Sequence, residues 1–464
     1  MKVKFLGAAE CVTGSCHLLT INNYKILLDC GLYQGGDGKA NSNEELEFNP
    51  EEIDVVILSH AHMDHSGRIP LLYKKGYKGK VLCTKGTADL SSIMLIDCAH
   101  IQVNDIAWKN KKREEKGLSS LEPLYDVKDA EESLKSFVGY DYNEEIQVLP
   151  NVKLIFRDAG HLLGSAICEI LVKDGNESEN KLVYSGDIGN INLPILKDPT
   201  LISQGDFIIM ECTYGNKEHK NVEENLQELI EITKKTFEVG GNVIIPSFSV
   251  GRTQEIIYAL NKYVEAEQLK DCKVYVDSPL ASESTKVFEK YQSYFDKEAK
   301  EFIKLGDDPL DFKGLFFTQS TEESIALKDI KEKIVIIAAS GMCEGGRIVH
   351  HLKNNLGREE CSVVFVGYQA EGTLGDKILK GNNKVKIFGE EIEVKAQIYN
   401  LEGLSGHGDK KVLYNWLKGF KNKPSTVFLV HGEGENIKSF NREITSKGYK
   451  SIIPSRNEEF YLGK

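Results

Sequence analysis

Paired cysteines, long apolar runs and a positive net charge are all missing from this sequence of 464 residues. The ten Cys are scattered with no Cys-x-x-Cys pair, which argues against a zinc knuckle and against a disulfide framework. No apolar run approaches the roughly 18 residues of a membrane helix, and the start MKVKFLGAAE lacks the apolar core of a signal peptide. We therefore expect a cytoplasmic protein with no membrane partner.

The formal net charge of -12 argues against a wholly basic nucleic-acid-binding surface, because Lys and Arg make most phosphate contacts. It does not exclude a local basic groove, and the segment from residue 381 onward is net basic. With 41% hydrophobic and 28% charged residues, the composition is that of an ordinary globular protein. At a prior of about 150 residues per domain, length alone suggests about three domains.

The hydrophobic pattern changes twice along the chain. Alternating strands fill the first 60 residues and return at 152–158, 166–172 and 181–187, with helical spacing at 87–112 and 127–137. From Glu211 strands and helices alternate strictly, which is typical of a parallel sheet with crossover helices. The predicted elements there are helices at 221–239, 251–266 and 345–356 and strands at 242–246, 273–277, 334–339 and 362–367. After about residue 380 hairpin-like strands return, so we predict one domain inserted into another.

The segment His60-Ala61-His62-Met63-Asp64-His65 places four potential metal ligands directly after the apolar strand IDVVILS. Zinc and similar divalent ions prefer imidazole and carboxylate ligands. Polar residues in a loop at the end of a buried strand are also well placed for function. The alternative, a polar surface turn, does not explain three of only eleven His within six residues.

Four further polar residues follow apolar strands in the same way: Asp29, His161, Asp187 and His431. Each alone could cap a turn or face solvent. Together with the HAHMDH cluster they predict a single metal site.

These motifs resemble the metallo-β-lactamase fold, which HAHMDH, Asp29, His161 and Asp187 match in order along residues 1–190. The alternating segment is similar to the β-CASP domain of nucleic-acid-processing members of that superfamily. The resemblance is carried by the segments GGNVIIPSFSVGRTQE (240–255), VYVDSPLA (274–281) and ASGMCEGGRIVHHL (339–352). The additional family motifs fall on Glu211 in ECTYG, His407 in LSGHGD and His431 in VHGE.

The resemblance implies an α/β protein: a metallo-β-lactamase αββα sandwich with an inserted, Rossmann-like parallel β-CASP domain. We expect the first domain to comprise residues 1–211 and 381–464, and the second residues 212–380. Two domains thus replace the three that length suggests.

The same resemblance implies a site with two zinc ions per chain. One ion would be bound by His60, His62 and His161, the other by Asp64, His65 and His431, with Asp187 bridging them. Asp29 would orient a ligand imidazole. The catalytic residues would be Asp64, Glu211 and His407, with His407 as the proton donor and Glu211 as its hydrogen-bond partner.

Two divalent ions activate water and neutralise the charge that develops on a phosphodiester, which suits phosphodiester hydrolysis. His431 stands where RNA-acting members carry His, and the chain is similar to bacterial relatives of the cleavage and polyadenylation endonuclease. We therefore predict endonucleolytic cleavage of single-stranded RNA, leaving 5′-exonuclease action and a homodimer open. In the insert, residues near the predicted helix starts are candidates for phosphate contacts: Ser247, Arg252, Ser340, Arg347 and His351.

Two alternatives from other classes remain. A thioesterase-type hydrolase would use the same metals on a small molecule, but it would not need so large an inserted domain. A scaffold of an RNA-processing complex would have lost ligands, whereas every motif position is filled here. Labelled RNA, labelled DNA and a thioester, each incubated with the protein, would separate these hypotheses.

Overall fold

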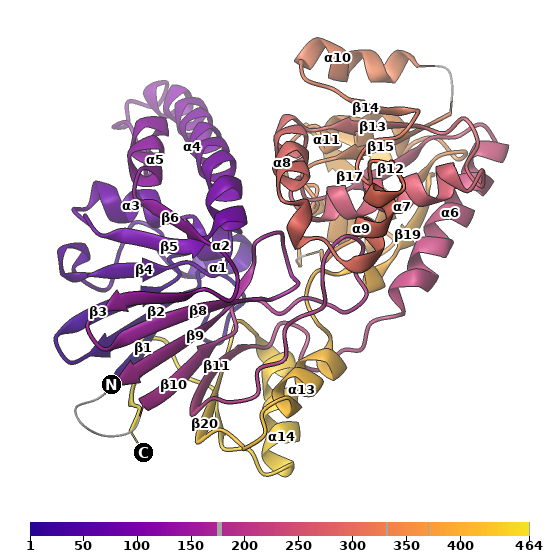
Figure 1. Cartoon of the computed structure of the whole chain (residues 1–464). Coiled ribbons are helices and arrows are strands. Elements are labelled where there is room, and N and C mark those ends of the chain that lie inside the picture. The colour runs from indigo at the N-terminus through magenta and orange to yellow at the C-terminus, as the bar shows by residue number, and fades with distance from the viewer. Residues whose placement is uncertain (174–178, 331–332, 370, 464) are drawn as a thin grey trace. The chain divides into compact units, whose positions relative to one another are not determined.

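The computed structural model describes residues 1–173, 179–330, 333–369 and 371–463 and divides into two compact units (Figure 1). Unit 1 comprises Met1–Asn190, Pro199–Glu218 and His407–Lys464, and unit 2 comprises Ile191–Asp198 and His219–Gly406. Among the described residues, no helix has both the length and the apolar character needed to cross a membrane.

Unit 1 contains two seven-stranded sheets within the described residues. The first has the order β22 (Glu459–Tyr461), β1 (Lys2–Gly7), β2 (Cys16–Ile21), β3 (Tyr24–Leu28), β4 (Val55–Ile57), β5 (Lys80–Thr84) and β6 (Phe137–Tyr140). The second has the order β21 (Ser451–Ile452), β20 (Thr426–Val430), β11 (Phe207–Glu211), β10 (Glu179–Tyr184), β9 (Ala166–Lys173), β8 (Val152–Asp158) and β7 (Glu145–Leu149). The helices of this unit are α1 (Gly35–Ala40), α2 (Met63–Ser66), α3 (Ile69–Lys74), α4 (Lys85–Glu114), α5 (Val127–Leu134), α13 (Lys410–Lys418) and α14 (Gly434–Ser446).

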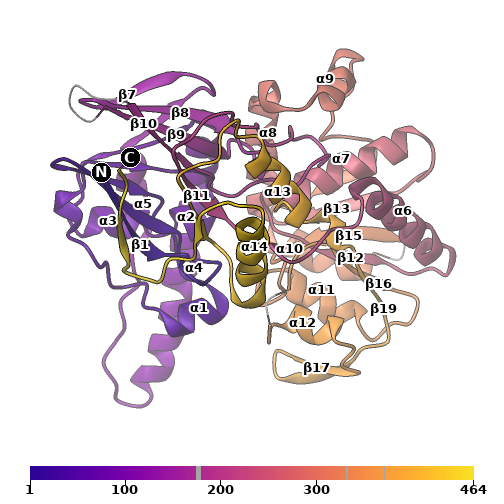
Figure 2. The same cartoon turned by 90° about the horizontal axis from the view of Figure 1, so that it is seen from below.

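The two sheets of unit 1 pack face to face, with helices on both outer surfaces. Alternate residues of a strand point to opposite faces of its sheet. Accordingly, Ile26 lies in the core between the sheets, whereas its neighbour Leu27 packs with Ile69 of α3 on the outside. On the second sheet, Met210 of β11 joins Trp416 of α13 in the other outer core. The views in Figures 1 and 2 show α13 and α14 beside this sheet, and the arrangement is the expected αββα sandwich.

Unit 2 contains a parallel sheet of six strands among the described residues. Its order is β14 (Leu315–Phe317), β13 (Lys273–Asp277), β15 (Ile334–Ala338), β12 (Val243–Pro246), β16 (Ser362–Phe365) and β19 (Gln397–Asn400). Its helices are α6 (Val222–Glu238), α7 (Arg252–Glu265), α8 (Pro279–Lys290), α9 (Lys297–Lys304), α10 (Thr321–Ala326), α11 (Ile348–Asn355) and α12 (Leu374–Leu379). This alternation is the Rossmann-like α/β insert expected from the sequence.

The end of unit 2 differs from the boundary at residue 381 that the sequence analysis expected. The hairpin of β17 (Lys384–Ile387) and β18 (Glu390–Glu393) belongs to unit 2, as does β19, which pairs in parallel with β16. Val385 and Ile387 are buried in the same core as residues of α11 and α12. The contacts of residues 381–406 are therefore made with the inserted unit, and unit 1 resumes at His407.

The polar residues of interest in unit 1 follow the carboxyl ends of parallel strands. β3 and β4 run parallel in the first sheet, and β10, β11 and β20 run parallel in the second. Parallel strands bring their carboxyl ends to one edge of a sheet, so the loops after these strands gather at one edge of the sandwich.

Candidate metal centre

Asp29, directly after β3, is completely buried and accepts four hydrogen bonds. Its Oδ1 accepts from the backbone N–H of Ser59 at 2.7 Å, and its Oδ2 accepts from the Ser59 hydroxyl at 2.7 Å and the Tyr184 hydroxyl at 2.5 Å. The fourth donor is Nδ1 of His65, 2.7 Å from Oδ2. Because Nδ1 of His65 donates to Asp29, its Nε2 is turned toward Asp187; burial lowers the pKa of His65, but the carboxylates of Asp187 and Asp29 outweigh this and raise it well above its usual value.

His60, His62 and His161 bring three ring nitrogens together. Nδ1 of His62 lies 3.1 Å from Nε2 of His60 and 3.1 Å from Nε2 of His161. Nε2 of His60 and Nε2 of His161 lie 3.4 Å and 3.5 Å from Oδ2 of Asp187. Burial lowers the pKa of all three imidazoles, that of His62 to about 3, so they are neutral and their lone pairs face one point.

Asp64, His65 and His431 form a second group on the other oxygen of Asp187. Nε2 of His65 and Nε2 of His431 lie 3.3 Å and 3.8 Å from Oδ1 of Asp187. Nε2 of His431 is also 3.3 Å from Oδ2 of Asp64. Each carboxylate oxygen of Asp187 therefore faces a different set of ligands.

The residues of this cluster fit divalent metal ions. Both carboxylate oxygens of Asp187 and Nε2 of His65 are buried and make no hydrogen bond. Burial alone would raise the pKa of Asp187, but the charges of His431 and His65 outweigh it and hold the pKa well below its usual range. A buried carboxylate without hydrogen bonds, surrounded by imidazole nitrogens, is costly unless cations lie against it. The donor set of imidazoles and carboxylates is the one that zinc-like ions prefer.

Glu211 and His407 lie beside this cluster. Oε1 of Glu211 accepts from the backbone N–H of Ile188 at 2.7 Å and lies 3.2 Å from Nδ1 of His407. Nδ1 of His407 is 3.9 Å from Oδ2 of Asp187, and its side chain keeps 22% exposure. Burial lowers the pKa of His407, but the carboxylates of Glu211 and Asp187 outweigh this and raise it to about 9. In the metal-free protein the imidazolium form therefore prevails at neutral pH.

Thr213 connects the two parts of the site. Its hydroxyl donates to Oε2 of Glu211 at 2.7 Å and lies 3.0 Å from Nδ1 of His431. Since the hydroxyl has one proton, it accepts from Nδ1 of His431, which turns Nε2 of His431 toward Asp64. Thr213 thus orients His431 as Asp29 orients His65.

The residues of the cluster are those predicted from the sequence, but three residues that orient them were not predicted: Ser59, Tyr184 and Thr213. Each is a hydroxyl residue without a distinctive spacing. The signal that could have found them is adjacency, since Ser59 directly precedes His60 and Thr213 stands two residues after Glu211.

The predicted phosphate-contact residues Ser247, Arg252, Ser340, Arg347 and His351 belong to unit 2, whereas the metal cluster belongs to unit 1. Arg252 is buried and paired with Glu255. Arg347 and His351 both bind the buried Asp277, at 2.8 Å and 2.5 Å. Ser247 is buried, and the Ser340 hydroxyl lies 3.3 Å from the carbonyl of Gly345. Their polar groups are engaged within the protein, and a phosphate role for them stays a prediction.

The fold and the site together define a metallo-hydrolase of the metallo-β-lactamase class. Matches to protein families agree along the chain: a metallo-β-lactamase superfamily domain at residues 18–211, a Beta-Casp domain at 253–378, and a Zn-dependent metallo-hydrolase RNA specificity domain at 391–454.

Three relatives cover nearly the whole chain. Ribonuclease TTHA0252 of Thermus thermophilus is 38% identical over 97% of this chain and 97% of its own. Transcription termination factor FttA of Methanocaldococcus jannaschii is 34% identical over 95% of this chain and 68% of its own. The RNase J-like protein of the same archaeon is 31% identical over 94% of both chains. The chain belongs to the β-CASP family of the metallo-β-lactamase superfamily.

A solved structure supports the fold independently. The crystal structure of a protein of unknown function from Enterococcus faecalis V583 superposes with a TM-score of 0.56 over 99% of both chains. At 13% sequence identity this likeness shows the fold alone.

Proposed function

We propose that this protein is a ribonuclease that cleaves single-stranded RNA endonucleolytically with two zinc ions. The observation that carries the proposal is Asp187, whose two buried oxygens each face a separate set of imidazole nitrogens without a hydrogen bond. The match to an RNA specificity domain and the ribonuclease at 38% identity support RNA as the substrate.

The ligand atoms divide into two sets about Asp187. His60, His62 and His161 would hold one ion, and Asp64, His65 and His431 the other. When bound, two such ions acidify a water and stabilise the negative charge that develops on a phosphodiester. Asp29 and Thr213 hold the second set in place through His65 and His431.

His407 would give its proton to the leaving oxygen of the RNA. Its Nδ1 lies against Glu211, whose carboxylate is itself held by Ile188 and Thr213. That fixed anion keeps His407 protonated and oriented, which is what a general acid needs near neutral pH. Glu211 acts through His407 and is a positioning residue in this scheme.

The test combines metal analysis with RNA cleavage. The wild-type protein should contain close to two zinc ions per chain and cut an RNA labelled at its 5′ or 3′ end into internal fragments. His407→Ala should keep both ions while kcat falls by about 10²- to 10⁴-fold. His100→Ala, which removes an exposed His of α4, is the matched control and should retain both properties.

Three results would count against the proposal. Release of single nucleotides from the 5′ end would replace the endonuclease by an exonuclease. Cleavage of a thioester with no action on RNA would refute an RNA substrate. Full turnover by His407→Ala would remove His407 as the proton donor.

A further inference from the structure

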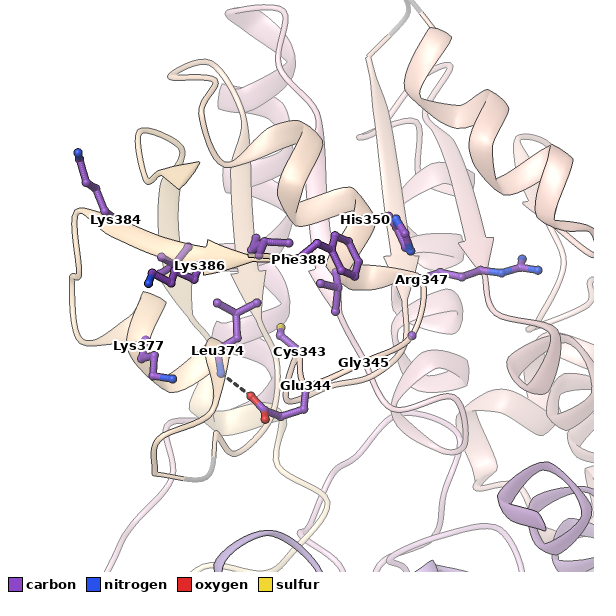
Figure 3. Close-up of a pocket in the computed structure, with 14 residues that line it drawn as sticks. Cys343, Glu344, Gly345, Arg347, His350, Leu374, Lys377, Lys384, Lys386 and Phe388 are labelled. Atoms are coloured by element: carbon purple, nitrogen blue, oxygen red, sulfur yellow. Dashed lines mark hydrogen bonds between the residues drawn. The ribbon is translucent and has the colours of Figure 1, made fainter. Parts of the chain in front are cut away.

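A second potential binding site lies wholly within unit 2, in a pocket of about 740 Å³. It is lined by the loop before α11, by α11 itself, by the start of α12 and by β17 with its turn (Figure 3). It shares no residue with the metal cluster of unit 1.

The turn between β17 and β18 is unusual. It has two residues, Phe388 and Gly389, with φ of 52° and 83°, as Ile387 pairs with Glu390 across it. Positive φ at both positions is the type I′ hairpin turn, for which Asn-Gly is strongly preferred. A bulky residue with positive φ is strained by about 1–3 kcal/mol, and such strain tends to be kept where a side chain has a function.

The strained backbone at Phe388 does not place its ring in the protein core. Phe388 keeps 57% of its surface exposed, although Val385 and Ile387 of the preceding strand β17 are buried. Its ring rests on that of His350, with the centroids 4.6 Å apart and the planes at 38°. His350 is itself exposed, because its neighbour His351 points to the opposite side and binds Asp277. The pair forms an aromatic surface open to solvent.

The charged residues around this surface favour an anion. Lys377 and Lys386 make no salt bridge within the described part of the chain, and Lys384 is paired with Glu391 at the surface. The carboxylate of Glu344, the acidic residue of the lining, is turned to the backbone N–H of Leu374 at 2.7 Å. The guanidinium of Arg347 points away from the pocket, toward Asp277 (Figure 3). The lysines therefore set the charge of this surface.

We infer that this pocket binds a segment of single-stranded RNA, with a base stacked on Phe388 and phosphates held by Lys377 and Lys386. An exposed aromatic platform next to unpaired lysines is the combination by which proteins bind single strands without sequence preference. This inference rests on the proposed action on RNA and adds a contact outside the residues of the metal centre. It also resolves the conflict between the net charge of -12 and a nucleic-acid partner, because the positive charge needs only to be local.

The informative substitution is Phe388→Asn. It creates the Asn-Gly pair that a type I′ turn prefers, so stability to urea should stay the same or increase. The base platform is lost, so the Kd for a labelled oligouridine of roughly 20 nucleotides should rise about tenfold. Binding is measured by fluorescence anisotropy on the zinc-loaded protein in the His407→Ala background. Phe316→Ala is the control, since that ring of β14 is 43% exposed and stacks on Tyr275.

The charge component is tested through salt dependence. The double substitution Lys377→Gln and Lys386→Gln should reduce the slope of log K against log salt by about 1.4, roughly 0.7 per phosphate contact on a single strand. Lys270→Gln with Lys313→Gln changes the net charge equally at exposed positions outside the pocket and should leave the slope unchanged.

The outcomes separate this inference from the proposed function. Unchanged affinity in Phe388→Asn, with RNA cleavage by the wild-type protein, would overturn the inference alone. No RNA binding and no cleavage by the wild-type protein would overturn both. If adenosine monophosphate binds in calorimetry and loses affinity in Phe388→Asn while oligouridine does not, the pocket is a free-nucleotide site and the inference is wrong.

Discussion

Replacing Asp29 by Asn should weaken metal binding although it removes no metal ligand. The carboxylate accepts three hydrogen bonds on Oδ2 and one on Oδ1. An Asn side chain offers one acceptor oxygen and one NH₂ group, so in either orientation at least one donor of Ser59, Tyr184 or His65 faces another donor. Leaving a buried donor unsatisfied costs about 1–3 kcal/mol.

The loss should appear mainly in the metal affinity, because Asp29 orients His65. Substitutions of this kind typically weaken metal binding by about 10- to 100-fold, which corresponds to about 1.4–2.7 kcal/mol. The measurement is zinc affinity in competition with a chromophoric chelator, alongside urea unfolding of the metal-free protein.

Asp277→Asn provides the control for burial. Asp277 is equally buried and also accepts hydrogen bonds from several donors, but it lies in unit 2. It should lower stability while leaving zinc affinity unchanged. Wild-type zinc affinity in Asp29→Asn would refute the role of Asp29 in holding His65.

Three further predictions concern the same unit. The folded-state pKa of His407 is raised from 6.5 to about 9. Its interaction with Glu211 should therefore stabilise the metal-free protein fully below pH 6.5, and this stabilisation should be lost as the pH rises through 9. The difference in urea stability between wild type and His407→Ala, measured across this pH range, tests the direction of this pH dependence. Gly31→Ala should lower the metal content and the melting temperature, because the added Cβ would lie 1.6 Å from the carbonyl oxygen of Asp64. In the control Gly36→Ala the added Cβ has no atom within 4 Å, so the metal content should not change. Trp416→Ala should destabilise the protein by about 3–5 kcal/mol in urea unfolding, since the indole is 1% exposed and donates to the carbonyl of Thr200 at 3.0 Å. A decrease in the free energy of unfolding of less than about 1 kcal/mol would show that the core between the second sheet and α13 is not closely packed.

Local sequence patterns predicted regular elements closely where the hydrophobic period was strong. The strand expected at 273–277 is β13 to the residue, and the helix expected at 221–239 is α6 at Val222–Glu238. The helix expected at 127–137 ends earlier, at Leu134, because Phe137 begins β6, which pairs with β5 at the edge of the first sheet. Pairing with a distant strand is not visible in a local pattern.

The expected domain boundary at residue 381 differed from the structure for the same reason. The segment after residue 381 has the alternating pattern of strands, but that pattern does not specify which sheet those strands join. β19 pairs with β16, and Ala396 is buried in the core of unit 2. The partner of Arg347 and His351 could not be predicted from local sequence either, since Asp277 lies 70 and 74 residues earlier in the chain.

The sequence by itself determined which residues can bind metal. The type and order of His60, His62, Asp64 and His65 after one apolar strand, with further ligands after others, already define the donor set, because ligand chemistry depends on side-chain identity. Only the tertiary structure decided how these ligands are oriented. The hydrogen bonds from Ser59 to Asp29 and from His431 to Thr213 join residues that follow neighbouring strands of one sheet, and the bond from Tyr184 to Asp29 joins residues of different sheets. These residues are far apart in sequence, so the contacts exist only once the strands have paired and the two sheets have packed.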